Sequence, residues 1–307
     1  MKASEAILGG DRRALARGLT LLETGGPEGV ALLDELWNRV GRAKRLGITG
    51  PPGAGKSTLV ASLLAAFRGR GALVGVIAVD PTSPFSGGAL LGDRHRMTRE
   101  AADDGVFMRS LASRGSLGGL ARAAPAALDL LDAAGFDLLM VETVGVGQSE
   151  VEVALTADTV AVVLSPESGD AVQAMKAGLL EVADILCVNK ADREGAGELA
   201  ATLESMLDRR EEAAWRPPEV LTNALEGSAA LLDAVDRHAA WLAEDARLAA
   251  RRLRCLESRL RRLVTELAAE RLLAGAGELL DREAEEVRGG VRSVLHAAER
   301  VVGELLR

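Results

Sequence analysis

The sequence predicts an α/β protein whose central domain has three layers, with helices on both faces of a mostly parallel sheet. Two observations predict this class. Short β-prone apolar runs alternate with helical stretches, and several runs are apolar on consecutive residues, as in strands buried on both faces. Repeated strand–helix–strand order also implies right-handed crossovers that cover both faces of the sheet. The expected strands are Leu46–Thr49, Leu73–Val79, Val106–Arg109, Leu138–Val141, Thr159–Leu164, Ile185–Val188 and Val220–Thr222.

Composition limits the classes of function. The chain has 307 residues, 48% of them hydrophobic and 27% charged, which is ordinary for a globular protein and excludes wholesale disorder. A formal charge of −8 and an aromatic content of 2% argue against a nucleic-acid partner. Cys187 and Cys255 are too few for a disulfide framework or a four-thiolate zinc site. Because neither a signal peptide nor an apolar run of bilayer length is visible, we expect a cytoplasmic protein with no membrane attachment.

Residues 1–44 predict an N-terminal helical segment that packs on the central domain at 45–240. Asp11 is placed to cap a helix over Arg12–Glu23, and Pro27 suits the first turn of a second helix. One face of that second helix is apolar and is expected to be buried. Its residues are Val30, Leu33, Leu36, Trp37 and Val40.

Residues 241–307 predict a C-terminal helical extension, because Gly and Pro punctuation fades and helix formers take over. Leucines at alternating steps of three and four form a seam of about two heptads. The extension either folds back on its own domain or forms an arm for self-association, and the seam favours the arm. The arginines around the seam, Arg251 and Arg252 among them, are expected to be a solvated face. A second helix is expected over Glu278–Leu306, interrupted near Gly289-Gly290. The seam consists of Leu253, Leu256, Leu260, Leu263 and Leu267.

A glycine-rich stretch after the first expected strand predicts a phosphate site. Residues 50–57 read GPPGAGKS, which fits G-x-x-x-x-G-K-[ST] and stands between a strand and a helix over Ser57–Phe67. Glycines let backbone N–H groups approach phosphate oxygens, and the helix N-terminus adds partial positive charge. Lys56 is expected to reach the β- and γ-phosphates, and the Ser57 hydroxyl to bind Mg²⁺. The central domain is therefore predicted to have the P-loop NTPase fold.

The element N-K-A-D at 189–192 follows an expected strand and predicts a guanine reader. Guanine presents N1–H and its 2-amino group side by side, so the Asp192 carboxylate can accept from both, whereas adenine lacks this donor pair. The Lys190 stem can lie over the base, and Asn189 can brace the loop and approach the base edge. The expected ligands are therefore GTP and GDP rather than ATP.

The end of the last expected strand supplies a further candidate contact with the base. Asn223 and Ala224 occupy the place of an S-A-[KL] element that also touches guanine in GTPases. Asn223 stands where Ser is usual, so its contact with the base is expected to differ. Both residues are included among the predicted nucleotide-binding residues.

The segment after Leu138–Val141 predicts a metal site and a switch. It begins with Glu142, where the corresponding element of small GTPases begins with Asp. An acid at this strand tip can hold Mg²⁺ through water or position the attacking water. Gly145 can offer its backbone N–H to the γ-phosphate, and this contact disappears on hydrolysis.

Two further acids are candidate ligands of Mg²⁺, because hard cations favour carboxylates and water. Asp80 follows the strand over Leu73–Val79 and would lie beside the phosphate site if the sheet is parallel. Asp93 lies in a stretch rich in Gly, Ser and Pro that suits ordering around a ligand. Helix capping or a solvated loop acid is the alternative role for each.

Together these stretches closely resemble the MeaB/ArgK family of P-loop GTPases, in order and spacing, over almost the whole chain. The most specific runs are VDPTSPFSGGALLGDRHRM at 79–97 and ETVGVGQSEVEV at 142–153. Members of this family are GTPase chaperones of adenosylcobalamin-dependent acyl-CoA mutases, chiefly methylmalonyl-CoA mutase. They gate cofactor loading, protect or reactivate the mutase, and are homodimers built through the C-terminal extension. The resemblance implies the same partner, the same dimer and Mg²⁺-dependent GTP hydrolysis for this chain.

The family pattern also distributes roles over the residues of this chain. It implies magnesium and switch roles for Asp80, Asp93 and Glu142. Together with the phosphate-loop motif, this predicts Lys56, Glu142 and Asp93 as catalytic residues and Ser57, Asp80, Asp93 and Glu142 as ligands of Mg²⁺. In the loop Ser165–Gly178, Glu167 stands where the family usually has Gly. The implied nucleotide-binding residues are Gly53, Ala54, Gly55, Lys56, Ser57, Thr58, Gly145, Asn189, Lys190, Asp192, Asn223 and Ala224.

Three other functions are weighed against this one. A metal-delivery GTPase of the nickel type would need a His-rich tract or a Cys/His cluster, and His95, His238 and His296 are far apart in the sequence. A transport-associated P-loop ATPase or kinase is disfavoured by Asp192. A nucleotide-dependent scaffold that barely hydrolyses GTP is the third alternative.

Overall fold

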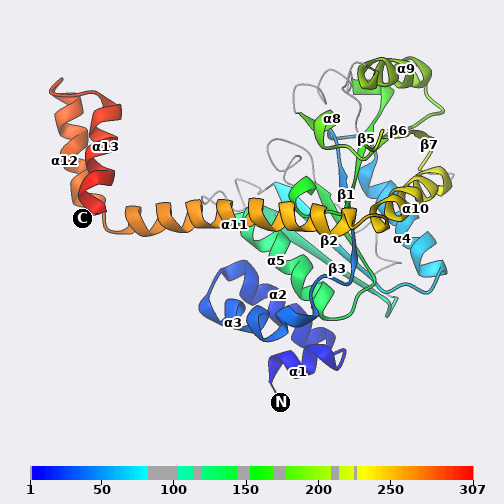
Figure 1. Ribbon diagram of the computed structural model, residues 1–307, viewed down its shortest axis with the longest axis horizontal. Coiled ribbons are helices and arrows are strands. Elements are labelled where there is room, and N and C mark those ends of the chain that lie inside the picture. The colour runs from blue at the N-terminus through cyan, green and yellow to red at the C-terminus, as the bar shows by residue number, and fades with distance from the viewer. Residues whose placement is uncertain are drawn as a thin grey trace. The chain divides into compact units, whose positions relative to one another are not determined.

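The computed structural model describes residues 2–81, 103–113, 119–143, 153–168, 178–208, 214–224 and 227–306. Its centre is a seven-stranded sheet in the order β3-β2-β4-β1-β5-β6-β7, and every pairing is parallel (Figure 1). This confirms the α/β class and each of the expected strands. The strands are β1 (Lys44–Thr49), β2 (Val74–Pro81), β3 (Val106–Ser113), β4 (Leu138–Thr143), β5 (Thr159–Leu164), β6 (Ile185–Asn189) and β7 (Glu219–Thr222).

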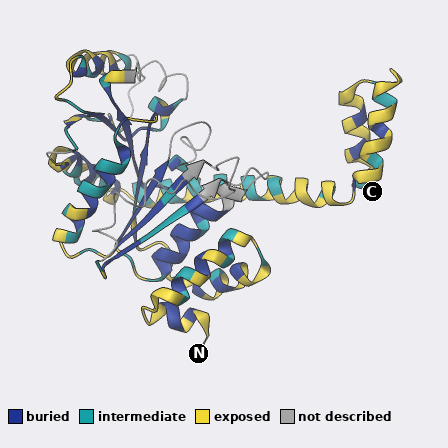
Figure 2. Cartoon of the chain, turned by 180° about the vertical axis from the view of Figure 1, so that it is seen from behind, coloured by how far each residue is buried: buried dark blue, intermediate teal, exposed yellow. Residues whose placement is uncertain are grey.

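Helices cover both faces of the sheet, as consecutive apolar residues in the strands require. In β4, Leu138 and Met140 pack with the cluster under α4 (Lys56–Gly69) and α10 (Ala229–Ala243). Leu139 and Val141 point to the opposite face, where α5 and α9 complete a second cluster. Figure 2 shows the buried strands between helices whose outer faces are exposed. The helices of the second face are α5 (Gly119–Ala133) and α9 (Ala196–Leu207).

The N-terminal helices pack onto the α5 face of the sheet. The Asp11 carboxylate accepts hydrogen bonds from Arg13 N at 2.8 Å and Ala14 N at 3.1 Å, so it caps α2 as expected. The predicted buried face of α3 is partly wrong, because Val30 and Trp37 are exposed to 59% and 47%. The helix instead buries a stripe displaced by one position, and its members are Gly29, Leu32 and Leu36. The segment consists of α1 (Ala3–Leu8), α2 (Arg12–Thr24), α3 (Pro27–Leu36) and the 3₁₀ turn η1 (Trp37–Arg39).

Short elements connect the later strands. The 3₁₀ turn η3 (Val153–Leu155) precedes β5, η4 (Pro166–Ser168) follows it, and α8 (Leu179–Val182) leads into β6. Because all strands are parallel, the residues that follow β1, β4, β5, β6 and β7 gather at one edge of the sheet. We refer to this as the carboxyl edge and to the opposite one as the amino edge.

The long helix α11 (Arg247–Ala274) begins in the compact unit formed by residues 1–256. Its first turns are fixed at the amino edge by two bidentate ion pairs. Arg251 donates to the Asp184 carboxylate at 2.8 and 2.7 Å, and Arg252 donates to the Asp158 carboxylate at 2.8 and 2.6 Å. The expectation that these arginines form a solvated face is therefore wrong, because both reach carboxylates at the sheet edge.

Residues 257–307 form a second compact unit. It contains the rest of α11, α12 (Gly277–Arg288) and α13 (Val294–Leu305), and the interruption expected near Gly289-Gly290 separates the last two helices. Glu283 of α12 is 3% exposed and forms ion pairs with Arg292 and Arg300. These ion pairs join α12 to α13 and to the turn before it.

Candidate nucleotide site at the carboxyl edge

The glycine-rich loop between β1 and α4 lies at the carboxyl edge, in the conformation that its glycines allow. Gly50, Gly53 and Gly55 have positive φ angles of 137°, 80° and 88°. A Cβ at Gly50 would lie 2.0 Å from the carbonyl oxygen of Val163, and one at Gly55 would lie 2.3 Å from Nδ2 of Asn189. Only residues without a Cβ at Gly50 and Gly55 let the loop lie this close to Val163 and Asn189, and the same glycine backbone can approach phosphate oxygens.

Lys56, the first residue of α4, is buried in this loop. Its Nζ donates to the carbonyl oxygens of Gly50 at 2.6 Å and Pro51 at 2.9 Å. These bonds hold the ammonium group of Lys56, a residue that is 6% exposed, inside the loop, where a phosphate oxygen can replace a carbonyl oxygen. Thr58, two residues further along, is half-buried in the first turn of the same helix.

Ser57 and Glu142 lie together beside the phosphate loop. The Ser57 hydroxyl donates to Oε1 of Glu142 at 2.6 Å, and Glu142 is 2% exposed near the end of β4. Next to this pair, the Thr143 hydroxyl donates to the Thr49 hydroxyl at 3.1 Å. A carboxylate and a hydroxyl in contact are the oxygen ligands that Mg²⁺ takes, so the donor set fits the predicted metal.

Asn189 joins the phosphate loop to the base-reading segment. Its Nδ2 donates to the carbonyl oxygen of Ala54 at 2.8 Å. Its Oδ1 accepts from the Thr222 hydroxyl at 3.2 Å and from Ala224 N at 3.1 Å. A single buried amide therefore ties together the segments that follow β1, β6 and β7, as the bracing role expected for Asn189 requires.

The remaining base-reading residues lie on the same turn. Lys190 has a φ of 57°, and Ala191 N donates to the carbonyl oxygen of Thr222 at 3.0 Å. This geometry leaves the Asp192 carboxylate exposed, where it can accept from a ligand. Asn223 lies on the neighbouring segment and accepts from Gly227 N at 3.1 Å through its backbone carbonyl.

Three predicted site residues receive no side-chain description. Asp93 and Gly145 lie outside the described residues, and Asp80 is placed only by its backbone in β2, opposite Ala112 of β3. Their roles stay predictions. The structure brings together the phosphate loop, Ser57, Glu142 and the base-reading turn.

Two contacts at this edge were not expected from the sequence. The Thr222 hydroxyl donates to the side chain of Asn189. The sequence indicates this contact only through the position of Thr222 at the end of the last strand. Glu167 of η4 forms an ion pair with Lys190, and its departure from the family pattern is the corresponding signal. Cys187 is fully buried, and burial raises the pKa of its thiol to about 12, so it packs as a small apolar residue.

Comparison with known proteins identifies the chain. A family model described as methylmalonyl Co-A mutase-associated GTPase MeaB matches residues 15–277. The chain belongs to the MeaB family of GTPases. A Pyrococcus horikoshii protein named as a GTPase is 46% identical over 283 residues, which cover 90% of this chain and 89% of that protein. Guanine-nucleotide binding is thus a property of the family.

Two other similarities extend over most of the chain. The methylmalonic aciduria type A homolog, mitochondrial, of Caenorhabditis elegans is 35% identical over 73% of this chain and 61% of its own length. A crystal structure of a protein named LAO/AO transport system kinase superposes with a TM-score of 0.77 and 29% identity, covering 99% of this chain and 97% of the other. This superposition and the parallel sheet establish that the chain has the P-loop GTPase fold.

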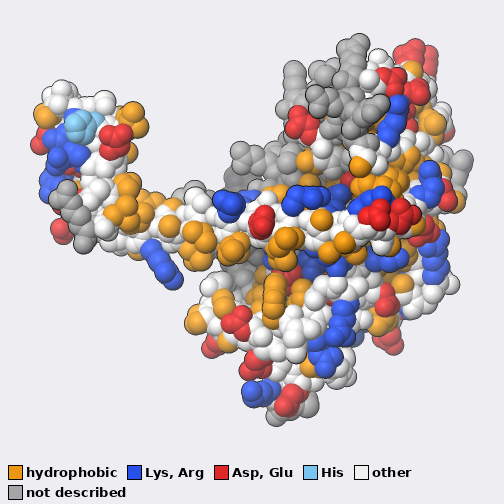
Figure 3. Space-filling view, viewed as in Figure 1, with side chains coloured by type: hydrophobic (Ala, Val, Ile, Leu, Met, Phe, Trp, Pro, Cys, Tyr) orange, Lys and Arg blue, Asp and Glu red, His pale blue; other side chains and the backbone are white. Residues whose placement is uncertain are grey.

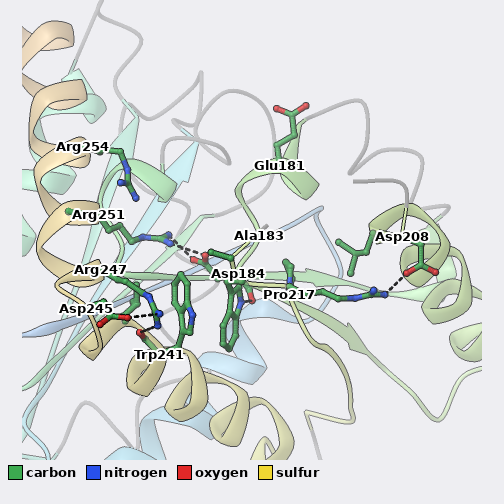
Figure 4. Close-up of a pocket in the computed structure, with 16 residues that line it drawn as sticks. Glu181, Ala183, Asp184, Asp208, Pro217, Trp241, Asp245, Arg247, Arg251 and Arg254 are labelled. Carbon is green, nitrogen blue, oxygen red and sulfur yellow. Dashed lines mark hydrogen bonds and ion pairs between the residues drawn. The ribbon is translucent and has the colours of Figure 1, made fainter. Parts of the chain in front are cut away.

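The amino edge of this MeaB family member contains a cavity of about 1130 Å³. Figure 4 shows Trp241, Arg247 and Arg251 beside Asp184, with dashed lines from Arg251 to Asp184 and from Arg247 to Asp245. Because Asp184 directly precedes β6, this cavity lies at the opposite edge from the phosphate loop. It is therefore separate from the nucleotide site.

Two properties of the described ranges bear on the alternative functions. No group of three or more His, Cys, Asp or Glu side chains in these ranges is arranged to hold a metal ion. The helices in the same ranges include none with the length and apolar character needed to cross a bilayer.

Proposed function

We propose that this MeaB family member binds GTP at the carboxyl edge, hydrolyses it slowly with Mg²⁺, and regulates an adenosylcobalamin-dependent acyl-CoA mutase through its nucleotide state. The observation that carries the nucleotide assignment is the hydrogen bond from Asn189 to Ala54, because it joins a phosphate loop to a guanine-reading turn. Asp192 is exposed on that turn and matches the paired donors of guanine.

The geometry supports a mechanism based on positioning and charge stabilisation. Lys56 binds phosphate oxygens in place of the carbonyl oxygens it now contacts, and the loop N–H groups stabilise charge on the leaving diphosphate. Glu142 orients the hydroxyl of Ser57 and is placed to hold a water for in-line attack. A bound Mg²⁺ would neutralise charge on the β- and γ-oxygens, held by Ser57 and by Glu142 directly or through water.

Binding is tested first, by calorimetric titration with GDP and with ADP in Mg²⁺. We expect GDP to bind at least about tenfold more tightly than ADP, since ADP leaves the Asp192 carboxylate poorly matched. Lys56→Ala is expected to weaken GDP binding at least about tenfold, as loss of a charge-assisted contact predicts. Lys44→Ala, at an exposed lysine on β1, is the matched control. Equal affinity for ADP would instead favour the transport-associated ATPase or kinase.

Hydrolysis is tested by release of inorganic phosphate. We expect Glu142→Gln to retain GDP binding and to lower the rate at least about a hundredfold, the range for loss of a group that positions or polarises the nucleophile. Removal of Mg²⁺ with a chelator is expected to abolish turnover in the wild type. A Glu142→Gln variant that hydrolyses GTP at the wild-type rate would contradict the assigned role.

The mutase partner is supported by the description of the matching family model and by the name of the C. elegans relative. Two nucleotide states can regulate a partner only if the partner binds them with unequal affinity. The test is to measure binding of methylmalonyl-CoA mutase to the GDP-bound and GTP-analogue-bound protein, together with loading of adenosylcobalamin onto the mutase. Equal affinities and unchanged loading would leave a GTPase without this client.

We also propose that a second copy of the chain covers the exposed apolar side chains of α11. Leu260, Val264 and Leu267 are 63%, 58% and 41% exposed at helical spacing. Figure 3 shows hydrophobic side chains along α11 with basic side chains among them. Leu260→Asp with Val264→Asp is expected to yield monomers in light scattering, whereas Glu257→Gln, at an exposed position of the same helix, leaves dimers. Monomeric wild type would overturn this assignment.

A further inference from the structure

The Lys190 side chain is held by a residue from outside the base-reading turn. Its Nζ donates to Oε2 of Glu167 at 2.5 Å. The other oxygen of Glu167 lies 3.6 Å from Nε of Arg193, which lies 3.6 Å from Oδ2 of Asp192. These four charged side chains connect η4, which follows β5, to the turn that follows β6.

The backbone of the turn is already fixed without this ion pair. Lys190 adopts a φ of 57°, Arg193 N donates to the carbonyl oxygen of Lys190 at 2.9 Å, and Ala191 N donates to that of Thr222. The movable part of the turn is therefore the Lys190 side chain, a flexible chain that loses conformational entropy when it is ordered. A partner that orders it before the ligand arrives removes part of this cost from binding.

Glu167 has the chemistry to be that partner. The hydrogen bond from Lys190 holds the pKa of the Glu167 carboxyl below its usual value, so the group is ionised at neutral pH. The side chains of Lys190 and Glu167 are 32% and 43% exposed, which places the pair at the surface of the site and leaves the lysine stem open to a ligand. An exposed pair of this kind makes a modest contribution.

We propose that Glu167 is a positioning residue for nucleotide binding: its carboxylate anchors the Lys190 ammonium group so that the lysine stem is ordered to cover the face of the bound base. This inference rests on the proposed guanine-nucleotide binding. It predicts that Glu167 raises the affinity for the nucleotide but does not affect the discrimination between guanine and other purines. The lysine stem contacts the flat face of any purine, whereas Asp192 reads the 2-amino group.

The experiment measures the affinities of GDP and of inosine diphosphate, which lacks the 2-amino group. Glu167→Gln is expected to lower both affinities by the same factor, about two- to fivefold, the size of a partly exposed ion pair. The ratio of the two affinities therefore stays at its wild-type value. Glu167→Asp keeps the charge and is expected to restore part of the lost affinity.

Two further variants complete the design. Glu194→Gln alters an exposed acid on the same turn that forms no hydrogen bond or ion pair with the described residues, and it should bind GDP as the wild type does. Asp192→Asn should lower the ratio of GDP to inosine diphosphate affinity, which Glu167→Gln leaves unchanged.

The outcomes separate this inference from the function on which it rests. Failure of the wild type to bind GDP would overturn the proposed function itself. Normal GDP binding by the wild type, with equal or tighter binding by Glu167→Gln, would overturn the positioning role and indicate that Glu167 competes with the base for Lys190. A changed affinity ratio in Glu167→Gln would also overturn it, because the residue would then act on the base edge.

Discussion

The two edges of the sheet are both polar, but their polar groups are held in different ways. At the amino edge, Asp158 and Asp184 are each paired with an arginine of α11 in bidentate geometry. At the carboxyl edge, the described bonds of Lys56 run to loop carbonyls, and that of Glu142 runs to a hydroxyl. Bidentate pairs between buried charges fix a structure, whereas the bonds of Lys56 to loop carbonyls can be exchanged for bonds to a charged ligand. The ion pair at the carboxyl edge, Lys190 with Glu167, is partly exposed and contributes less.

A third arginine at the amino edge, Arg45, is paired with two carboxylates. Arg45 of β1 donates to Asp129 and Asp132 at 2.9 Å each, and Asp132 also accepts from Gly41 N and Arg42 N. Burial lowers the pKa of Arg45, but the attraction of the two carboxylates outweighs it and the pKa is raised overall. The guanidinium therefore stays charged, and this edge is expected to determine stability rather than binding.

The largest expected effect tests the amino edge through Asp184→Ala. This change removes the partner of Arg251 and the acceptor of Val160 N, which donates to Asp184 at 2.8 Å. Breaking a buried pair leaves a charge uncompensated, so the free energy of unfolding is expected to fall by about 3 to 5 kcal/mol in urea denaturation. Asp236→Ala, which breaks the exposed pair with Arg70, should cost at most about 1 kcal/mol. Equal losses would remove the distinction between buried and exposed pairs.

An intermediate effect is expected at the carboxyl edge from Asn189→Ala. Loss of the amide leaves the Ala54 carbonyl and Ala224 N without this partner, at about 1 to 3 kcal/mol for a buried polar group. Because these bonds position two loops, we expect GDP affinity to fall about tenfold to a hundredfold in fluorescence titration. Asn38→Ala, at an exposed site in η1, is the control. Unchanged GDP affinity in Asn189→Ala would mean that the two loops bind the ligand independently.

The smallest expected effect concerns His238, which is fully buried and stacks on Trp241, a residue that lines the cavity of the amino edge. Its Nδ1 lies 2.9 Å from the Thr159 hydroxyl, and its Nε2 lies 3.5 Å from Oδ1 of Asp184. Burial lowers the pKa of this imidazole; the attraction of Asp184 opposes that shift, and the nearby charge of Arg251 adds to it. The folded protein therefore keeps His238 neutral at a pH where the unfolded chain takes up a proton.

The sign of the pH effect follows from this lowered pKa. As pH falls below about 6.5, the unfolded chain binds a proton that the folded chain does not, so stability declines. One such group changes the free energy of unfolding by at most about 1.4 kcal/mol per pH unit. His238→Gln should reduce the pH dependence of urea denaturation between pH 7 and pH 5, and His296→Gln, at an exposed position, should leave it unchanged. A larger loss of stability at low pH in His238→Gln would contradict a neutral buried histidine.

Local sequence patterns were sufficient to predict a feature where all the residues that form it lie close together in the chain. The glycines and Lys56 of the phosphate loop, the N-K-A-D turn and the cap at Asp11 were all predicted in place, because their chemistry depends on neighbours in the chain. The buried face of α3 was predicted partly wrongly, since Val30 and Trp37 are apolar but exposed. Hydrophobic periodicity fixes the width of an apolar stripe but not the part of it that a neighbouring helix covers.

The sequence by itself determined the succession of strands and helices along the chain, the glycine-rich loop and the N-K-A-D turn, because each depends on residues close together in the chain. Only the tertiary structure decided that Ser57 contacts Glu142, that Asn189 holds Ala54, and that Lys190 pairs with Glu167. These contacts join segments that follow different strands, and only the order of strands in the folded sheet brings such segments to the same edge.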